Sequence, residues 1–401
     1  MDLKSTYPFW PIKNGLPATY PFLKEDVTCD VVILGAGITG TLVADELSKR
    51  GLGVVLLDRR DVGQGSTAAT TGLLQYEIDV PLCDLIELVG KETAERAYRL
   101  CLDSISQLET LAAECKGEVA GFDRKTSIYV ASRKRHVQEL EREQAARYAA
   151  GIPSEFLTGD ELQDRYGLNF PVALVNQTAA VCDAFGMTHG LLQNCLQRGA
   201  KVFDRTDAVR IRQRQDKVEV TTDRGPTVFA RHIIFATGYE SQNQLRKPVA
   251  KLKSTYAFVS QPLEEMPGWN EKWLLWESAR PYLYLRTTQD RRVLLGGEDD
   301  PFRDPARRDR SIPRKTQKLL KRVSELFPKM PLEPEYAWAG TFGETKDGLP
   351  YIGASPDRPW AWFALGFGGN GITFSAVAAK ILADLIVGDD CPDAELFRFD
   401  R

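Results

Sequence analysis

Three glycines and one aspartate have the types and the spacing of a dinucleotide-binding site. Gly35, Gly37 and Gly40 follow an apolar run and open a segment whose apolar residues recur at helical spacing. Glycines at these positions permit a tight turn, close approach of a pyrophosphate and close packing of the helix on the strand. The N–H groups at the start of such a helix favour phosphate. Asp58 ends the next apolar run, 21 residues after Gly37, where a carboxylate accepts a hydrogen bond from a ribose hydroxyl.

A long loop of small side chains, from Gly63 to Gln75, follows the second apolar run. NAD and FAD share the strand–helix–strand unit, and an acid at position 58 disfavours the 2′-phosphate of NADP. A plain NAD domain would pass quickly into its next helix, whereas a loop rich in hydroxyl groups suits contact with an extended, flat cofactor. The loop therefore favours FAD, and a flexible surface loop is the alternative interpretation.

A second glycine-rich segment, Gly366–Gly371, opens the last apolar helix. The start of a helix attracts negative charge through its N–H groups and its dipole. Reduced flavin carries negative charge near N1 and O2, so a helix start aimed there stabilises charge that develops in the reaction. A capped core helix is the alternative. With the two segments above, this one predicts FAD.

The three segments together resemble the D-amino-acid oxidase superfamily of FAD-dependent amine oxidoreductases, over about residues 7–390. The segment 7–10 is similar to the start of gamma-glutamylputrescine oxidase-type members, and 235–238, 347–353 and 363–372 are similar to the superfamily's later motifs. The resemblance implies an FAD domain built from separated segments and a sheet-based substrate domain over the reactive face of the flavin. It places FAD contacts at Gly35, Gly37, Gly40, Asp58, Arg59, Ser66, Thr67, Thr71, Gly72, Leu73, Val209, Thr237, Gly238, Gly369, Asn370, Gly371, Ile372 and Thr373.

Two positions that tether flavin covalently in some members carry no suitable residue here. Sarcosine oxidase-like members have a cysteine in the segment that reads Gly340–Gly343 in this chain, which contains none. Other members have a histidine in the loop occupied by Thr67 and Ala68. The resemblance therefore implies non-covalent FAD.

The positions implied to face the substrate are mostly neutral. Gln75, Thr341 and Thr373 stand where amino-acid-oxidising members hold the substrate carboxylate with cations. Arg286 is the nearby cation that we predict to bind substrate, with a surface arginine beside Asp290 as the alternative. Tyr256, Tyr282 and Tyr284 fit either a ligand role or a core. The predicted catalytic set is Gln75, Tyr256, Tyr284, Arg286 and Thr341.

Leu294 bears on the electron acceptor. Sarcosine oxidase-like members place a lysine on the strand that here reads Arg292–Gly297, and by that alignment Leu294 occupies the lysine position. A positive charge there speeds reduction of oxygen by stabilising superoxide. We therefore expect slow reaction with oxygen, and the acceptor is left open as oxygen, a quinone or a protein.

The predicted fold class is α/β, with a Rossmann-type FAD-binding domain and an α+β substrate domain built on an inserted, mostly antiparallel sheet. The expected domain boundaries are 28–80, 172–250 and 335–390 for FAD binding, 81–171 and 251–334 for substrate, and 1–27 for an N-terminal extension. Apolar patterns predict strands at 30–34, 54–57, 127–130, 231–236 and 281–286 and short strands through 208–230. Helical patterns cover 38–50, 91–115, 135–150 and 372–388, a βα pattern covers 186–203, and the charged stretch 304–322 is expected to be a loop entering a solvated helix.

Composition excludes several classes of protein for this chain of 401 residues. A net charge of −3 shows no basic footprint for nucleic acid. No apolar run approaches the ~18 residues of a membrane helix, and residues 1–26 lack the pattern of a signal peptide. Seven dispersed cysteines and three histidines have no zinc spacing, which predicts no metal site and a cytoplasmic location.

The function expected from these patterns and from the resemblance is oxidation of a C–N bond. An amine or amino-acid-like small molecule would give a hydride to flavin N5. A second hypothesis is a flavoprotein electron-transfer subunit of a larger dehydrogenase complex. A third, a plain NAD-dependent dehydrogenase, is opposed by the small-residue loop and the C-terminal glycines.

Overall fold

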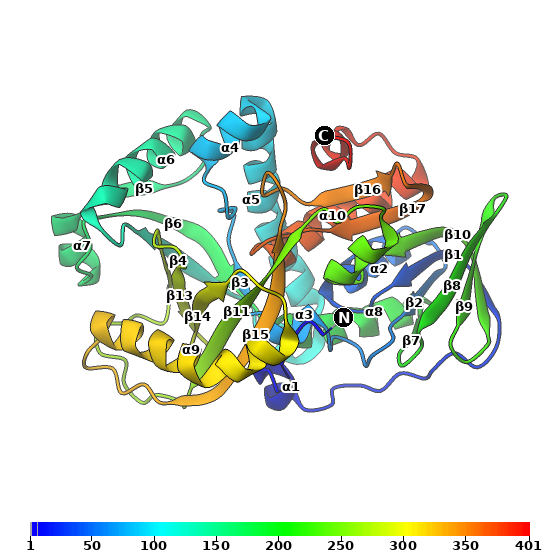
Figure 1. The fold of residues 1–401 in the computed structure, drawn as a ribbon, viewed down its shortest axis with the longest axis horizontal. Helices are drawn as coiled ribbons and strands as arrows, with labels where there is room; N and C mark the ends of the chain where they lie inside the picture. The colour runs from blue at the N-terminus through cyan, green and yellow to red at the C-terminus, as the bar shows by residue number, and fades with distance from the viewer. Residues whose placement is uncertain (1, 6) are drawn as a thin grey trace.

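The computed structural model describes residues 2–5 and 7–401, which form two sheets, each with its own covering helices (Figure 1). The eight-stranded first sheet lies to the right in Figure 1 and the nine-stranded second sheet to the left. Strands of the first sheet come from three separated parts of the chain, as the resemblance implied. The predicted α/β fold with a mostly antiparallel second sheet is confirmed.

The first sheet has a parallel centre. Its strand order is β16 (Tyr351–Ser355), β17 (Arg358–Leu365), β10 (Thr227–Phe235), β1 (Val27–Leu34), β2 (Val54–Leu57) and β7 (Lys201–Phe203). The four neighbouring pairs from β17 to β7 are parallel, and β16 is antiparallel to β17. A hairpin of β8 (Ala208–Arg214) and β9 (Lys217–Thr222) extends from β10.

The two faces of the first sheet are both buried, which explains why its strands read as continuous apolar runs. Val31 and Ile33 of β1 pack with helices α2 (Ile38–Lys49), α8 (Ala184–Gln197), α10 (Gly371–Val387) and α5 (Lys91–Glu114). Val32 and Leu34, which point the other way, pack with residues of β9 and β10. The glycine turn and Asp58 therefore lie at the carboxyl ends of β1 and β2, where both strands are buried.

The second sheet has the order β15 (Pro334–Glu344), β11 (Lys251–Ser260), β14 (Val293–Asp300), β13 (Leu283–Thr287), β12 (Trp273–Glu277), β4 (Asp123–Val130), β6 (Val172–Val181) and β3 (Leu73–Leu74). β5 (Glu155–Thr158) pairs with β6, and β4 with β12 is the parallel pair. Its core includes residues of α9 (Pro305–Leu326) and α7 (Gly159–Tyr166). The remaining helices are α1 (Phe9–Asn14), α3 (Ser66–Ala69), α4 (Leu82–Val89) and α6 (Val137–Ala149), with short 3₁₀ turns at 116–118, 134–136, 238–244 and 392–397.

Three local predictions need adjustment. The stretch 304–322, expected to be a loop entering a solvated helix, is helix from Pro305 onward, because Asp304 caps the amide of Arg307 and α9 continues through Pro313. The βα pattern at 186–203 is a helix followed by a strand, α8 and then β7. β3, β6 and, apart from Pro334, β15 fall inside the ranges expected for the FAD domain but pair in the second sheet. The division into domains stays a prediction.

The N-terminal segment adds to the edge of the second sheet beside β15. The amide of Ser5 donates to Ala339 O at 2.9 Å, and the amide of Thr341 donates to Leu3 O at 2.8 Å. Among residues 2–5 and 7–401, no helix combines the length and the apolar character needed to cross a membrane.

Candidate cofactor and substrate site

A cavity of about 440 Å³ lies where the two sheets meet, and it is large enough for a bound organic ligand. Its lining begins at the carboxyl ends of β1 and β2 and reaches strands β11, β13 and β14 of the second sheet. Most of the predicted FAD positions line it: Gly35, Gly37, Asp58, Arg59, Ser66, Thr67, Thr71, Leu73, Thr237, Gly238, Gly369, Asn370, Gly371 and Ile372.

Two glycines of the first turn are required by close backbone contacts. Gly35 has φ +104°, and a Cβ there would lie 2.4 Å from the carbonyl oxygen of Ala236. A Cβ on Gly40 would lie 1.9 Å from the carbonyl oxygen of Gly35. Gly40 does not line the cavity; it lets α2 pack against β1, which holds the N-terminus of the helix at the cavity.

Asp58 is held in place by backbone amides at the end of β2. Its Oδ2 accepts from the amide of Ala36 and its Oδ1 from the amide of Arg60, both at 2.8 Å. Burial raises the pKa of this carboxyl above its ordinary value, and the two amides oppose that change. A carboxylate oxygen has two acceptor sites, so both oxygens can also accept from ribose hydroxyls.

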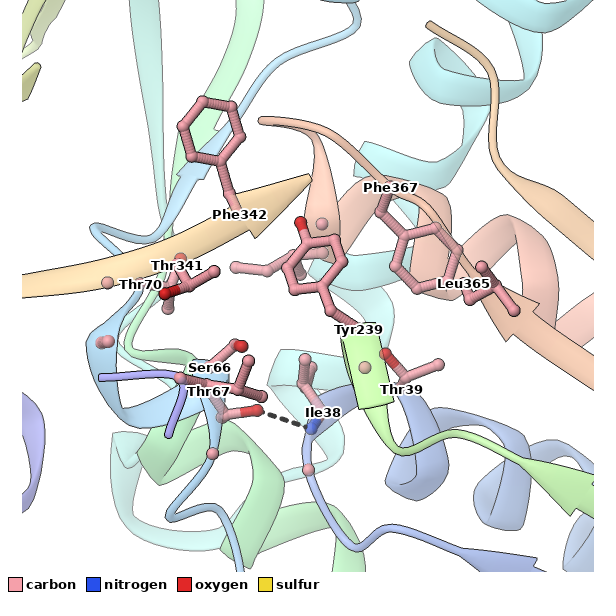
Figure 2. A pocket seen from close by; sticks show the side chains of 18 of the residues that line it. Ile38, Thr39, Ser66, Thr67, Thr70, Tyr239, Thr341, Phe342, Leu365 and Phe367 are labelled. Carbon is pink, nitrogen blue, oxygen red and sulfur yellow. Dashed lines mark hydrogen bonds between the residues drawn. The ribbon is translucent and has the colours of Figure 1, made fainter. Parts of the chain in front are cut away.

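Thr67 ties the small-residue loop to helix α2. Its Oγ1 accepts from the amide of Ile38, the first residue of the helix, at 3.0 Å (Figure 2). A Cβ on Gly37 would lie 2.9 Å from the same hydroxyl oxygen. Part of the loop therefore has regular structure, since Ser66–Ala69 forms the short helix α3.

The second helix start, at Asn370 and Gly371, borders the same cavity from the other side. The side chain of Asn370 donates to the carbonyl oxygens of Gln75 (3.2 Å) and Glu77 (2.8 Å). The amide of Gly369 donates to Asp79 Oδ2 at 2.7 Å. These bonds join the segment after β3 to the start of α10.

The lining residues fit FAD. The start of α2 offers N–H groups and partial positive charge to a pyrophosphate, and the start of α10 offers the same to the anionic edge of a reduced flavin. Asp58 lies at the ribose position, and a single cavity connects it to the start of α10. Ser66 and Thr71 of the small-residue loop line the same cavity and carry hydroxyl groups.

Three further predicted contacts lie outside the lining. Gly72 has φ +69° and packs against the carbonyl oxygen of Cys182, 2.2 Å from where a Cβ would be. Val209 is 60% exposed, although its neighbour Ala208 lines the cavity. Thr373 is buried in α10 and donates to Asn370 O at 3.0 Å. The side chains of Val209 and Thr373 and the backbone of Gly72 therefore do not line the cavity.

The predicted catalytic residues divide into two groups. Gln75, Thr341 and Tyr284 line the cavity. Tyr256 also borders it, but its ring belongs to the core of the second sheet and its hydroxyl donates to Asp300 at 2.9 Å. The core interpretation of Tyr256 therefore describes its side chain better than a ligand role.

Arg286 requires a correction, because it does not line the cavity. Its guanidinium is buried and donates to the carbonyl oxygens of Thr71 at 2.7 Å and Cys182 at 3.0 Å. It also lies 5.1 Å from the ring of Trp10, and burial lowers its pKa to about 10. The sequence does not reveal this because the carbonyl groups that engage the guanidinium come from distant segments.

Several carboxylates at the end of the cavity on the second sheet were not predicted. Glu77, Asp79 and Asp299 line this end, which we call the acidic end. Burial raises the pKa of Asp299 to about 6, and the negative charge of Asp79 adds to the change. The rings that border the acidic end are those of Tyr239, Trp276, Tyr282, Tyr284 and Phe342. The sequence signal that could have predicted the acidic end is the pair of acids at positions 77 and 79, directly after the small-residue loop.

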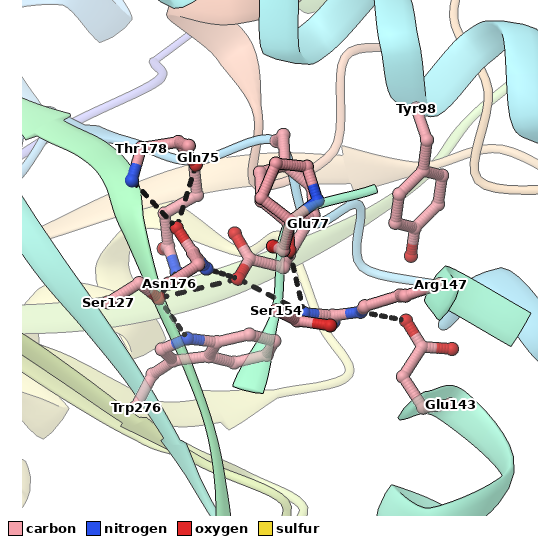
Figure 3. A network of polar contacts seen from close by, with 12 residues as sticks. Gln75, Glu77, Tyr98, Ser127, Glu143, Arg147, Ser154, Asn176, Thr178 and Trp276 are labelled. Atoms are coloured by element: carbon pink, nitrogen blue, oxygen red, sulfur yellow. Dashed lines mark hydrogen bonds and ion pairs between the residues drawn. The ribbon is translucent and has the colours of Figure 1, made fainter. Parts of the chain in front are cut away.

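A buried polar network supports the acidic end from behind (Figure 3). Arg147 is fully buried and donates to Glu143 at 2.7 Å and to Glu77 Oε1 at 3.4 Å. Asn176 donates to the same Glu77 oxygen at 2.6 Å. Trp276 donates to Ser127 at 3.1 Å and stacks on the ring of Tyr129. Glu77 and Trp276 are therefore held rigidly where they face the cavity.

Comparison with known proteins gives relatives along nearly the whole chain. A Bacillus subtilis protein named for a Rieske 2Fe-2S iron–sulfur centre is 26% identical, over 97% of this chain and 74% of its own length. Glycine oxidase of Bacillus licheniformis is 27% identical, over 90% of this chain and 93% of its own. Gamma-glutamylputrescine oxidoreductase of Escherichia coli is 26% identical, over 93% and 87%.

The solved structures agree on the fold. Glycine oxidase from Geobacillus kaustophilus superposes with a TM-score of 0.75 at 21% identity, covering 91% of this chain and 96% of that chain. The model of the family described as FAD dependent oxidoreductase (DAO) matches residues 30–385. This match runs through both sheets and beyond the glycine-rich start, and we conclude that the chain belongs to the DAO family and is an FAD-dependent oxidoreductase.

Proposed function

We propose that this enzyme oxidises a C–N bond of an amine or amino-acid-like small molecule. The observation that carries the proposal is the continuity of the cavity, which joins an FAD site to a pocket of aromatic and acidic side chains on the second sheet. An amine fits such a pocket because carboxylates and aromatic rings both attract a cationic nitrogen. The names of two relatives, glycine oxidase and gamma-glutamylputrescine oxidoreductase, support the same class of reaction.

Bound FAD would supply a two-electron acceptor, so that the carbon next to the nitrogen loses a hydride to flavin N5 and becomes an imine that water hydrolyses. The protein's part is position and electrostatics. Gln75, Tyr284 and Thr341 lie where they can orient the substrate, and a carboxylate of the acidic end can accept the proton of the ammonium group before the hydride leaves. The start of α10 favours negative charge on the reduced cofactor.

Anaerobic bleaching of the flavin tests this proposal. The purified holoenzyme is mixed without air with a panel of primary amines, secondary amines and amino acids, and absorbance of the oxidised flavin is followed. We expect at least one amine to bleach the flavin and to yield the corresponding carbonyl compound, with ammonia released from a primary amine or the smaller amine released from a secondary one. Bleaching by hydroxy acids or glycerol phosphate, with none by any amine, would contradict the proposal.

A second candidate is a flavoprotein that passes electrons to a protein partner within a larger complex. It is favoured by the relative named for a Rieske iron–sulfur centre, of which this chain covers 74%. The two candidates share the cofactor and differ in what oxidises it. Turnover by the isolated chain with an amine and a dye would favour the enzyme acting alone, whereas co-purification in a stable hetero-oligomer would favour the complex.

A further inference from the structure

We propose that the acidic end of the cavity binds a second cationic nitrogen of the substrate. The substrate class would then be an aliphatic amine with two positive charges and no carboxylate on the carbon that is oxidised. This inference rests on the proposed function, because it names the amine that the same cavity would take. Three observations carry it: unpartnered carboxylate oxygens, a strained bulge that presents one of them, and an excess of negative charge among aromatic rings.

Two carboxylate oxygens at the acidic end are buried without any hydrogen-bond partner. They are Asp299 Oδ1 and Glu77 Oε2. Both residues line the cavity, and Glu77 is only 5% exposed. A buried ionised carboxylate that lacks a partner is costly, so these oxygens mark a place where a ligand that donates hydrogen bonds and carries positive charge would be stabilised.

The backbone turns Asp299 into the cavity at a β-bulge. Between the pairs Ser254–Asp300 and Tyr256–Gly297, strand β14 has two residues where β11 has one. Glu298, inside the bulge, has φ +58°, a left-handed conformation that is unfavourable for a residue with a side chain. As a result Asp299 faces the cavity, while Asp300 turns to the other side. There Asp300 pairs with Lys315 at 2.9 Å and accepts from Tyr256.

The cations near the acidic end offset only part of its negative charge; Arg280 and Lys253 act on Asp79, yet its pKa stays above the ordinary value because the carboxyl is buried. Arg147 lies between two carboxylates, those of Glu77 and Glu143, so one positive charge faces two negative ones. Lys253 is engaged by Glu344 at 2.6 Å. Among the described lining residues of this end, Arg280 is the one cation; it is exposed, with its guanidinium 5.1 Å from the ring of Tyr282.

Aromatic rings complete the site. The rings of Tyr282 and Tyr284 lie 5.6 Å apart, centroid to centroid, and Trp276 lines the same end. Tyr284 fits because its partner across the sheet is Gly296, where a Cβ would lie 2.3 Å from the tyrosine hydroxyl. Carboxylates combined with aromatic faces recognise an alkylammonium group through ion pairing and cation–π attraction. An α-carboxylate would instead be repelled, and Gln75 and Thr341 offer it no charge.

Probes that share one chain length within each series separate the effect of charge from the effect of size. The oxidised holoenzyme is titrated without air with 1,4-diaminobutane, butylamine and 4-aminobutanoate, and with the corresponding eight-carbon series. Binding is followed by the perturbation of the visible flavin spectrum and by thermal shift, and reduction is followed by bleaching. We expect the diamine to bind at least about tenfold more tightly than the monoamine, the factor for one charged hydrogen bond, and the amino acid to bind most weakly.

Asp299→Asn should remove the preference for the diamine over the monoamine, and Asp79→Asn should reduce it. Asp300→Asn is the matched control, because Asp300 is the next residue but faces Lys315 on the opposite side. We expect this control to lower the melting temperature and to keep the preference. If Asp299→Asn does not fold, Asp79→Asn and the probe series on the unmodified enzyme still decide the question.

The outcomes separate this inference from the proposed function. Bleaching by amines together with tighter binding of 4-aminobutanoate or butylamine than of the diamine would overturn the inference alone. A preference for the diamine that Asp299→Asn and Asp79→Asn leave unchanged would also overturn it. Diamine binding that perturbs the flavin spectrum, without bleaching by any amine, would support the cation site and contradict the proposed function.

Discussion

The hydroxyl of Thr67 accepts a hydrogen bond from the amide of Ile38 at 3.0 Å, and this bond joins two segments that border the same cavity. Ile38 is the first residue of α2, so its amide has no partner within the helix. Thr67 belongs to the loop that the sequence analysis associates with FAD. The order of this loop and the start of the helix are therefore coupled.

We expect Thr67→Val to destabilise the apoprotein by about 1 kcal/mol, the typical value of such a bond, and to weaken FAD binding. Valine has nearly the shape of threonine but cannot accept the amide's hydrogen. Thr67→Ser keeps the acceptor and should stay close to the unmodified protein. Denaturant unfolding and fluorescence titration with FAD measure the two effects. Equal behaviour of the valine and serine variants would contradict a role for the bond.

We expect FAD to be bound without a covalent link. Of the described residues that line the cavity, none is cysteine or histidine, the two residue types expected to form a tether. Acid precipitation of the yellow protein should therefore leave FAD in the supernatant, as chromatography and absorbance will show. Yellow colour that remains in the washed, denatured pellet would contradict the prediction.

Arg147→Met should destabilise the fold by about 3–5 kcal/mol, because it leaves Glu77 and Glu143 buried without their cation. Chemical denaturation measures this change. Arg142→Ala is a control on the same helix; that side chain is exposed and pairs with Asp84 and Glu87 at the surface, where such pairs contribute about 0–1 kcal/mol. Similar losses of unfolding free energy in both variants would show that the buried ion pairs stabilise the fold no more than the surface pairs do.

The affinity for 1,4-diaminobutane should fall as the pH is lowered through about 6. Burial and the charge of Asp79 raise the pKa of Asp299 to about 6, so below that pH the carboxyl gains a proton and attracts a cation less. Lys253 and Glu344 also act on this group. The binding constant measured from pH 5 to 8 should show this step, and Asp299→Asn should flatten it.

The same pKa shift has a definite sign for stability. The folded-state pKa of Asp299 lies above its ordinary value of 3.8. The folded state therefore binds the proton more tightly, and the group's contribution to the free energy of unfolding falls as the pH rises from 3.8 to about 6. In Asp299→Asn this contribution is absent, so the difference in stability between variant and parent should change across that window.

We expect the reduced enzyme to react slowly with oxygen. Leu294 is fully buried in an apolar cluster with Ala68 and Trp338, so the position that the resemblance aligns with the lysine of sarcosine oxidase-like proteins has no charge here. The loss of one preorganised charge costs about 2.7–4 kcal/mol, or two to three decades in rate. Stopped-flow mixing of photoreduced enzyme with aerated buffer measures this. Reoxidation within milliseconds would refute the expectation.

Leu294→Lys tests the cause of slow reoxidation. Where the variant retains FAD, the added charge should speed reaction with oxygen, and Leu294→Met, similar in size and neutral, should not. The lysine will also lower the melting temperature, because it introduces a charge into an apolar cluster. Equal oxygen rates in the lysine and methionine variants would mean that this position does not govern the acceptor.

The sequence by itself determined the parts of the site that depend on local backbone geometry. Gly35 has a positive φ of +104° and Gly40 meets the carbonyl oxygen of Gly35 in the same turn, and Asp58 lies at the end of a strand whose apolar run is plain in the sequence. The glycine-rich start of α10 is equally local. Such features can be predicted because turn conformation, strand burial and helix N-termini depend on residues that are near one another in the chain.

Only the tertiary structure decided which charges face the cavity. From its place in the sequence Arg286 was predicted to bind substrate, yet its guanidinium donates to the carbonyl oxygens of Thr71 and Cys182. Asp79 lies in the segment between β3 and α4 and Asp299 lies in β14, and packing brings both to the cavity, where the charge of Asp79 acts on Asp299. The direction of a side chain such as Asp299 follows from a bulge in its strand pairing, and pairing between distant strands cannot be read from the residues of either strand alone.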